Sequence, residues 1–321
     1  MPVDGELTAT EITGGRSNLT YRVSDEQSHW VLRRPPTGGL TPSAHDVARE
    51  YRIVAALAGS PVPVATAIAY SADPTVLGGP FALVGFVPGR VLRVQDDLTS
   101  IDDAGLERIG DELIRVLVAL HAVPYADRGL ADFGRPKGFF ARQVKRWRQQ
   151  WDLVTRCPRA DLDRLHAGLV ERTPTAGGAS IVHGDYRIDN TLLDPGEPSR
   201  MLALVDWEMS TIGDPLTDVA MFCAYQHPAF DHVVGEPAAS TSTRWPNPDA
   251  IAQAYAQGSG RDLGDFDAYL GLAYLKLAVI AEGISARHRA GAGHGLGFET
   301  AGAAVPDLLA AGLSILQRAH S

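Results

Sequence analysis

The chain has few cysteines and no excess of basic residues. Its 321 residues include only Cys157 and Cys223, which provide neither a disulfide framework nor a thiolate metal cluster. Acidic residues outnumber Lys and Arg by 38 to 29, and the formal net charge is −9. Binding to a nucleic-acid backbone draws on dense Lys and Arg. We therefore expect no nucleic acid among the partners of this protein.

The sequence also lacks an uninterrupted apolar run long enough to cross a membrane. Residues 270–284 are apolar, but Lys276 and Glu282 interrupt them, and the run is short of the roughly 20 residues that span a bilayer. It predicts a buried helix and no membrane partner. The first residues show no basic and apolar signal pattern, so the expected location is the cytoplasm. With 45% hydrophobic residues and no long linker or internal repeat, the chain fits two lobes of one enzyme better than separate domains.

One segment carries side chains suited to phosphoryl transfer. His183, Gly184, Asp185 and Asn190 occur in the run HGDYRIDN, and Asp206 follows in LVDWE. Phosphoryl transfer uses a positioned carboxylate base and oxygen ligands for Mg²⁺. A lone Asp is more often a turn or capping residue. The combination at this spacing favours a catalytic site.

The neighbouring sequence predicts how these residues meet. Residues 181–182 read as the end of a buried strand, and residues 191–193 and 201–205 read as two strands joined by a turn. A hairpin of that length brings its two ends together. We therefore expect Asn190 to lie near Asp206, where one metal ion could contact both.

These elements resemble the HGDxxxxN and D-W-E motifs of the aminoglycoside phosphotransferase-like branch of the protein-kinase-like superfamily. The resemblance implies an α+β, two-lobed protein-kinase-like fold, with a small antiparallel β lobe that carries one helix and a larger, mainly helical lobe. We place the nucleotide-binding lobe at residues 1–87 and the catalytic and substrate-binding lobe at residues 88–321. By the same resemblance, Asp185 is the catalytic base, and Asn190 and Asp206 are Mg²⁺ ligands.

The amino-terminal part contains a candidate phosphate-binding turn. The segment TGGRSN, which includes Gly14, Gly15, Ser17 and Asn18, separates two short predicted strands. Glycines there allow backbone N–H groups to approach phosphate oxygens. A Gly-Gly turn taken alone is more often a simple hairpin connection, so this interpretation depends on the downstream motif.

A basic residue on the next predicted strand would contact the α- and β-phosphates. Arg33 stands where most kinase-like proteins have Lys, which keeps the charge but replaces a point charge with a planar fork. Arg34 is the alternative, because only one of two neighbours on a strand points inward. Residues 43–46 resemble a capping box that opens a helix. Glu50 on that helix would pair with Arg33; otherwise it is a solvated surface residue.

The connection between the lobes is predicted after residues 81–87, a continuous apolar run that ends at Pro88. By resemblance, the adenine binds there to backbone groups of Gly85 and Val87. An acidic residue is common where Gly85 stands. Its absence has little effect on contacts made by the backbone.

The rest of the chain is mostly helical in pattern. Residues 138–154 mix aromatic and basic side chains, but their spacing fits an amphipathic helix better than a nucleic-acid surface. Asp214 is predicted at the start of a helix. By resemblance, Asp218 is a buried brace of the catalytic loop, and His183 supports the same loop.

A second resemblance concerns the acceptor. Residues 282–287, EGISAR, are similar to a stretch of phosphotransferases related to the kinase-like domain joined to some acyl-CoA dehydrogenases. Glu282 and Arg287 could line the acceptor site, or they could form an ion pair or lie on the surface. The resemblance points to a hydroxyacyl thioester, besides an aminoglycoside-like or other small-molecule alcohol.

The sequence thus predicts a phosphotransferase that uses Mg²⁺ and ATP, or GTP, to phosphorylate a small-molecule hydroxyl. A catalytically silent nucleotide-binding module is the main alternative, motivated by Arg33 and Gly85. Retention of Asp185, Asn190 and Asp206 counts against it. A metal-dependent hydrolase would need a further cluster of His or carboxylate ligands, which the sequence does not show.

Overall fold

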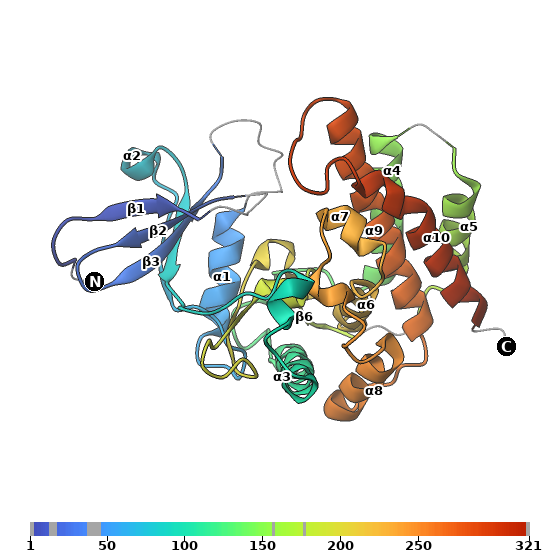
Figure 1. Cartoon of the computed structure of the whole chain (residues 1–321), viewed down its shortest axis with the longest axis horizontal. Helices are drawn as coiled ribbons and strands as arrows, with labels where there is room; N and C mark the ends of the chain where they lie inside the picture. The colour runs from blue at the N-terminus through green and yellow to red at the C-terminus, as the bar shows by residue number, and fades with distance from the viewer. Residues whose placement is uncertain (1–2, 13–17, 37–45, 156–157, 176–177, 319–321) are drawn as a thin grey trace.

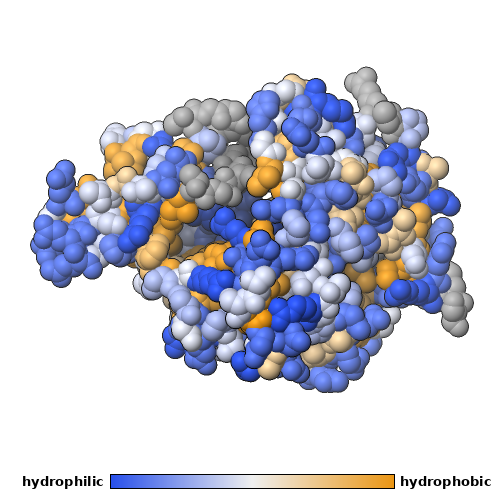
Figure 2. Space-filling model, in the orientation of Figure 1, coloured by the Kyte–Doolittle hydropathy of each residue, from blue (hydrophilic) through white to orange (hydrophobic). Residues whose placement is uncertain are grey.

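The computed structural model describes residues 3–12, 18–36, 46–155, 158–175 and 178–318. The chain forms two lobes, a smaller one built around a β-sheet and a larger one built mainly of helices (Figure 1). The surface is hollowed between the two lobes (Figure 2). This arrangement is the one predicted from the sequence.

The sheet of the smaller lobe has the strand order β1-β2-β3-β5-β4, and all neighbouring strands are antiparallel. The strands predicted on both sides of the TGGRSN segment, the next predicted strand and the apolar run at residues 81–87 are confirmed as strands, whereas β4 was not predicted. The strands are β1 (Thr8–Glu11), β2 (Leu19–Ser24), β3 (His29–Arg34), β4 (Ala67–Ser71) and β5 (Phe81–Gly85).

Helix α1 (Val47–Leu57) packs against β4 and β5 of this sheet, and its Ile53 and Leu57 are fully buried. Its N-cap is Asp46, whose side chain accepts a hydrogen bond from the Arg49 N–H at 3.0 Å. The predicted capping box, opened by Ser43, is therefore wrong about the cap. Asp and Ser are similarly favoured at the N-cap position, so the sequence pattern alone did not show which of Ser43 and Asp46 caps the helix. Ser43 itself lies outside the described residues. A short second helix, α2 (Pro74–Leu77), adds to the one helix expected in this lobe.

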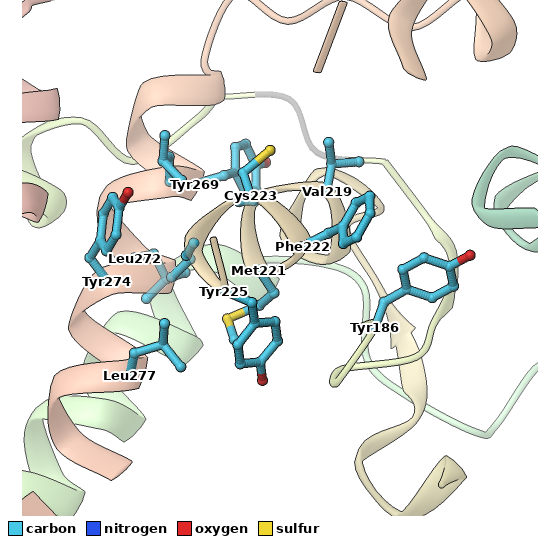
Figure 3. Packing of buried hydrophobic residues seen from close by; sticks show 14 of the residues in the cluster. Tyr186, Val219, Met221, Phe222, Cys223, Tyr225, Tyr269, Leu272, Tyr274 and Leu277 are labelled. Carbon is cyan, nitrogen blue, oxygen red and sulfur yellow. The ribbon is translucent and has the colours of Figure 1, made fainter. Parts of the chain in front are cut away.

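The larger lobe surrounds its core with helices from several parts of the chain. Tyr186 packs edge to face on Phe222 of α6, with ring centroids 5.7 Å apart, and α6 packs against α9 (Figure 3). The α-helices are α3 (Asp103–Ala122), α4 (Phe139–Val154), α5 (Ala160–Glu171), α6 (Leu216–Ala224), α7 (Phe230–Val234), α8 (Pro248–Ser259), α9 (Phe266–Arg289) and α10 (Ala301–Arg318). Short 3-10 helices are η1 (Gln95–Leu98), η2 (Ile188–Asn190), η3 (Trp207–Met209) and η4 (Ala239–Thr241).

Helix α9 contains the apolar run expected to be a buried helix. By length and composition alone it could cross a membrane, but 78% of its most apolar window is buried inside the molecule. It packs against α4, α6 and α10. The prediction of a core helix is confirmed.

Two small sheets frame the catalytic segment. In the first, β6 (Ser180–Val182) pairs with β9 (Thr211–Gly213). In the second, β7 (Thr191–Leu193) pairs with β8 (Met201–Leu204), as the predicted hairpin requires. The hairpin pairing continues beyond the strands, since the Val205 N–H donates to the Asn190 carbonyl at 2.9 Å. Because Asp206 follows Val205, the hairpin brings Asn190 and Asp206 to the same end.

Candidate active site

The loop between β6 and β7 is held by buried hydrogen bonds. The Asp218 carboxylate accepts from the backbone N–H of His183 at 2.6 Å and of Gly184 at 2.8 Å. His183 Nδ1 accepts from the Asp185 N–H at 3.2 Å, so in the neutral ring the proton is on Nε2, which donates to the Val205 carbonyl at 3.0 Å. Both residues therefore brace the loop, as expected. His121, at 3.3 Å from Asp218, is part of the same buried network.

Asp185 lies at the centre of this loop, and its side chain is 22% exposed. Asn190 Nδ2 donates to its Oδ2 at 3.0 Å, Arg187 Nε lies 3.4 Å from the same oxygen, and the Tyr225 hydroxyl donates to Oδ1. Burial alone would raise the pKa of Asp185. The charges of Arg187 and Lys276 and the Tyr225 hydrogen bond outweigh burial, so the pKa lies below its ordinary value. The carboxylate is ionised at neutral pH.

Asn190 and Asp206 present oxygens that could bind a cation. Asn190 uses its amide nitrogen on Asp185, which leaves the amide oxygen available to another partner. Asp206 Oδ1 is buried and accepts no hydrogen bond from the residues that the structure describes; Arg33 Nη2 lies 3.7 Å away. Asp206 also has a φ of 66°, a left-handed conformation found at no other non-Gly residue of the described ranges. Such backbone strain is concentrated at functional sites.

These donors fit Mg²⁺ better than Zn²⁺. Within the described residues there is no group of three or more His, Cys, Asp or Glu side chains that could hold a metal ion. Structural and catalytic Zn²⁺ sites use three or four such ligands. Mg²⁺ takes one or two protein oxygens together with waters and substrate phosphates. Among the described residues there is thus no ligand cluster of the kind that a metal-dependent hydrolase would need.

Arg33 and Glu50 form the ion pair predicted from the sequence. Arg33 Nη1 lies 2.9 Å from Glu50 Oε2, which selects Arg33 rather than Arg34. Asn18 Nδ2 donates to the other Glu50 oxygen at 2.7 Å. Burial, opposed by Arg33, raises the pKa of Glu50 to about 7.

Part of the predicted nucleotide-binding turn cannot be compared with this geometry. Gly14, Gly15 and Ser17 lie outside the described residues. Asn18, at the end of the same segment, is buried against Glu50. The structure thus links the end of this segment to the Arg33 pair.

The predicted hinge follows β5. The Gly85 N–H donates to the Thr66 carbonyl at 2.8 Å, so only its carbonyl could accept from a base. The Val87 carbonyl accepts from the Gly89 N–H at 2.9 Å, and within the described part of the chain no hydrogen bond engages the Val87 N–H. One carbonyl acceptor and one N–H donor two residues apart match the pair of contacts expected for an adenine.

Three residues near Asp185 were not singled out from the sequence. Arg187 and Tyr225 contact its carboxylate directly. Lys276 Nζ, from α9, donates to the Gly184 carbonyl at 2.6 Å. Two sequence signals could have pointed to them. Arg187 lies inside the HGDYRIDN run, and Lys276 is a single Lys within an apolar helix, where it was used only as evidence against a membrane span.

The two residues suggested for the acceptor site are not paired with each other. Glu282 Oε1 accepts from Arg289 Nη2 at 2.7 Å, within α9. A buried ion pair between Glu282 and Arg287 is not formed, because the partner of Glu282 is Arg289, whose side chain is 55% exposed.

Comparison with known proteins shows the family to which this chain is similar. Residues 8–269, more than half of the chain, match the model of the phosphotransferase enzyme family. Acyl-CoA dehydrogenase family member 10 of Mus musculus is 31% identical over 291 residues, covering 89% of this chain and 27% of the relative. Family member 11 of Homo sapiens is 30% identical over 294 residues, covering 90% of this chain and 37% of the relative. The chain thus spans about a third of the length of these curated relatives.

Solved structures share the protein-kinase-like fold. A crystal structure from Ralstonia eutropha, provisionally assigned as an aminoglycoside phosphotransferase, has a TM-score of 0.83 at 32% identity, covering 98% of this chain and 93% of that one. Aminoglycoside phosphotransferase APH(4)-Ia, solved with ADP and hygromycin B, has a TM-score of 0.65 at 14% identity, covering 97% and 93% of the two chains, which shows the fold alone. The family match, the two-lobed fold and the loop geometry together support a small-molecule phosphotransferase. The chain belongs to the phosphotransferase enzyme family.

Proposed function

We propose that this protein transfers the γ-phosphoryl group of a nucleoside triphosphate, ATP or GTP, to a hydroxyl group of a small molecule. One observation carries the proposal. Asp185 and Asn190 are hydrogen-bonded on one loop, while the β7–β8 hairpin brings to the same end Asp206 Oδ1, which accepts no hydrogen bond from the described residues. A base and two metal-facing oxygens are thereby available together.

Asp185 acts as the base in this proposal. Its pKa lies below the ordinary value, so at neutral pH its carboxylate accepts a hydrogen bond from the acceptor hydroxyl and orients it toward the γ-phosphorus. Transfer itself depends mainly on positioning and charge stabilisation. Arg187 and Asn190 contribute by fixing the carboxylate.

Asn190 and Asp206 would hold Mg²⁺, which when bound neutralises charge on the phosphate oxygens. Arg33 would contact the α- and β-phosphates, with Glu50 keeping its guanidinium in place. The backbone of Gly14, Gly15 and Ser17 would cover the phosphates, beside Asn18. The adenine or guanine of the nucleotide would bind to the Gly85 carbonyl and the Val87 N–H. The boundary between the two lobes would fall between residues 87 and 88.

The test begins with nucleotide binding. A thermal-shift titration with ATP and GTP, each with and without Mg²⁺, is followed by an acceptor panel scored for release of nucleoside diphosphate. We expect stabilisation that requires Mg²⁺ and disappears in Asp206→Ala. Asp185→Asn should keep nucleotide binding and lose release by a factor of at least about 10².

Asp194→Asn is a matched control, because Asp194 belongs to the same hairpin but pairs with Arg200 at the far turn. It should behave as wild type. Nucleotide binding without Mg²⁺ dependence and without release for any acceptor would instead favour a catalytically silent nucleotide-binding module. Release by Asp185→Asn at the wild-type rate would overturn the assignment of the base.

A further inference from the structure

A cavity of about 790 Å³ lies beside the catalytic loop. It is lined by residues from the start of α1, the segment of residues 132–135, α4, the segment of residues 208–211 and α9. Gly184, one residue before Asp185, forms part of its wall. Of the nucleotide-binding candidates that the structure describes, which are Asn18, Arg33, Glu50, Gly85 and Val87, none lines the cavity.

Positive charge dominates the cavity wall. Among the described residues, five cationic side chains line it and three carboxylates do, those of Asp46, Asp132 and Glu208. Asp132 is already paired with Arg52, which is not a lining residue. The cations are Arg49, Arg135, Arg142, Arg146 and Lys276.

The five cations are not neutralised by ion pairs. Across the described ranges, no carboxylate oxygen lies within 4.0 Å of any of them, the distance that defines every salt bridge of this structure. Arg49 donates to the carbonyls of Phe133 and Ser210, and Arg142 donates to backbone carbonyls. Carbonyl contacts satisfy hydrogen bonds but leave the net charge in place. The cavity therefore keeps an excess of positive charge, although the whole chain carries −9.

Lys276 is the most enclosed of these charges, at 7% exposure. Its Nζ lies 5.7 Å from the centre of the Trp147 ring, which stabilises a cation but does not neutralise it. Burial lowers the pKa of Lys276, and the carboxylates of Asp185 and Asp218, both beyond salt-bridge distance, oppose that shift and favour the charged form. A buried charge is costly without a close counter-charge.

The wall also contains unused hydrogen-bonding groups. Ser210, at 2% exposure, has an Oγ without a hydrogen-bond partner among the described residues, and Thr217 Oγ1 is in the same state. Both residues line the cavity. Native proteins rarely leave buried hydroxyls unpaired, so these donors point to a polar ligand. Hydroxyl donors and cations together match an anion.

We propose that this cavity binds the phosphoryl acceptor, and that the acceptor is an alcohol carrying an anionic group, either a carboxylate or a phosphate. This inference rests on the proposed function, because the cavity reaches the catalytic loop at Gly184, the residue before the proposed base Asp185, which is not itself a lining residue. The anionic group lies against the cations of α4 and α9, while the hydroxyl is presented to the catalytic loop at Gly184. Polycationic aminoglycosides are disfavoured by the same charges.

Residue-specific labelling tests the binding directly. Arg142 and Arg146 are exposed on α4 and react with phenylglyoxal, which is followed by peptide mass spectrometry. Glycerol 3-phosphate and glycerate represent the two anions, glycerol is the neutral control, and serinol is the cationic control. With Mg²⁺ and a non-hydrolysable nucleotide present, we expect the anionic alcohols to slow labelling of both arginines at least threefold. Exposed Arg115 on α3 serves as the internal reference and should label at an unchanged rate.

Kinetics test the same idea in the acceptor panel. The double variant R142Q/R146Q should raise KM for an anionic acceptor about tenfold, or roughly 1.4 kcal/mol. The control K145Q/R148Q removes two charges from the same helix outside the cavity, and its KM should stay near wild type. Hygromycin B should not stimulate nucleoside diphosphate release.

The outcomes separate the two proposals. Release with neutral or cationic alcohols, together with no protection by either anion, overturns the anionic acceptor while leaving the kinase intact. Protection of Arg142 and Arg146 without release for any alcohol overturns the proposed function but supports an anion site. Equal effects of the two double variants on KM would show that α4 charge acts only at long range, which also contradicts the proposal.

Discussion

The carboxylate of Asp218 provides the sharpest test of how the catalytic loop is held. It is fully buried and accepts from the N–H groups of His183 and Gly184, with His121 at 3.3 Å. Asp218→Asn keeps the shape but has one acceptor oxygen, and its amide nitrogen would face a backbone N–H. One charge-assisted hydrogen bond is lost and one buried donor is left unpaired.

The expected loss in free energy of unfolding follows from these contacts. A hydrogen bond to a charged group contributes about 1.5–3 kcal/mol, and an unpaired buried donor costs a similar amount. Some relaxation of the loop offsets the sum, so we expect Asp218→Asn to lose about 2–4 kcal/mol. This is a large part of the roughly 5–15 kcal/mol that stabilises a typical domain.

Urea unfolding measures this loss, with tryptophan fluorescence as the signal because Trp207 packs 4.7 Å from the His183 ring. Asp103→Asn is the control, since it removes a surface ion pair with Arg244 and should cost less than about 1 kcal/mol. Burial raises the pKa of Asp218, but its hydrogen bonds and His121 lower it more, so the stabilisation is present above pH 4 and is lost in stronger acid. Equal losses in the two variants at pH 7 would refute the bracing role.

Three further substitutions test the pairs around the site. Arg33→Lys should keep nucleotide binding but raise KM for the nucleotide severalfold, because the planar guanidinium that contacts Glu50 is lost. A larger increase in this KM for Arg33→Lys than for Arg33→Ala would contradict the prediction. Burial raises the pKa of Glu50 to about 7, so the free energy of unfolding of the wild type should fall as pH rises from about 4.5 to 7. In Glu50→Gln, the free energy of unfolding measured with urea should depend less on pH over that range. Tyr225→Phe removes a donor to Asp185, so the acidic limb of the kcat profile should move to higher pH, and an unmoved limb would argue against the contact.

Sequence reasoning located the elements that depend on local pattern. The HGDYRIDN run and the β7–β8 hairpin could be predicted because both are short-range features, and the hairpin fixed the neighbourhood of Asn190 and Asp206. The Arg33–Glu50 pair was predicted from the order of motifs. Because side chains alternate along β3, either Arg33 or Arg34 could have pointed toward Glu50, and only the contact in the structure shows that it is Arg33.

Features that depend on distant packing were not predictable in this way. Strand β9 has three residues and no alternation of its own, and it exists because β6 pairs with it. Tyr225 comes to Asp185 from a helix forty residues away along the chain. Lys276 reads as an interruption of an apolar helix until the fold places it on the Gly184 carbonyl. The pattern of apolar residues within one element does not indicate which distant element it will contact.

Gly184 links the catalytic loop to the basic cavity. Its N–H donates to Asp218 and its carbonyl accepts from Lys276, so both backbone polar groups are fixed from opposite sides by charged residues of α6 and α9. Its φ of 84° suits glycine, and a Cβ there would lie 2.6 Å from the Met209 carbonyl oxygen. Because Lys276 serves both the loop and the cavity wall, an anion bound to it would lie next to the peptide that positions Asp185. Under the proposed function, binding of an anionic acceptor and the position of Asp185 would therefore both depend on Lys276.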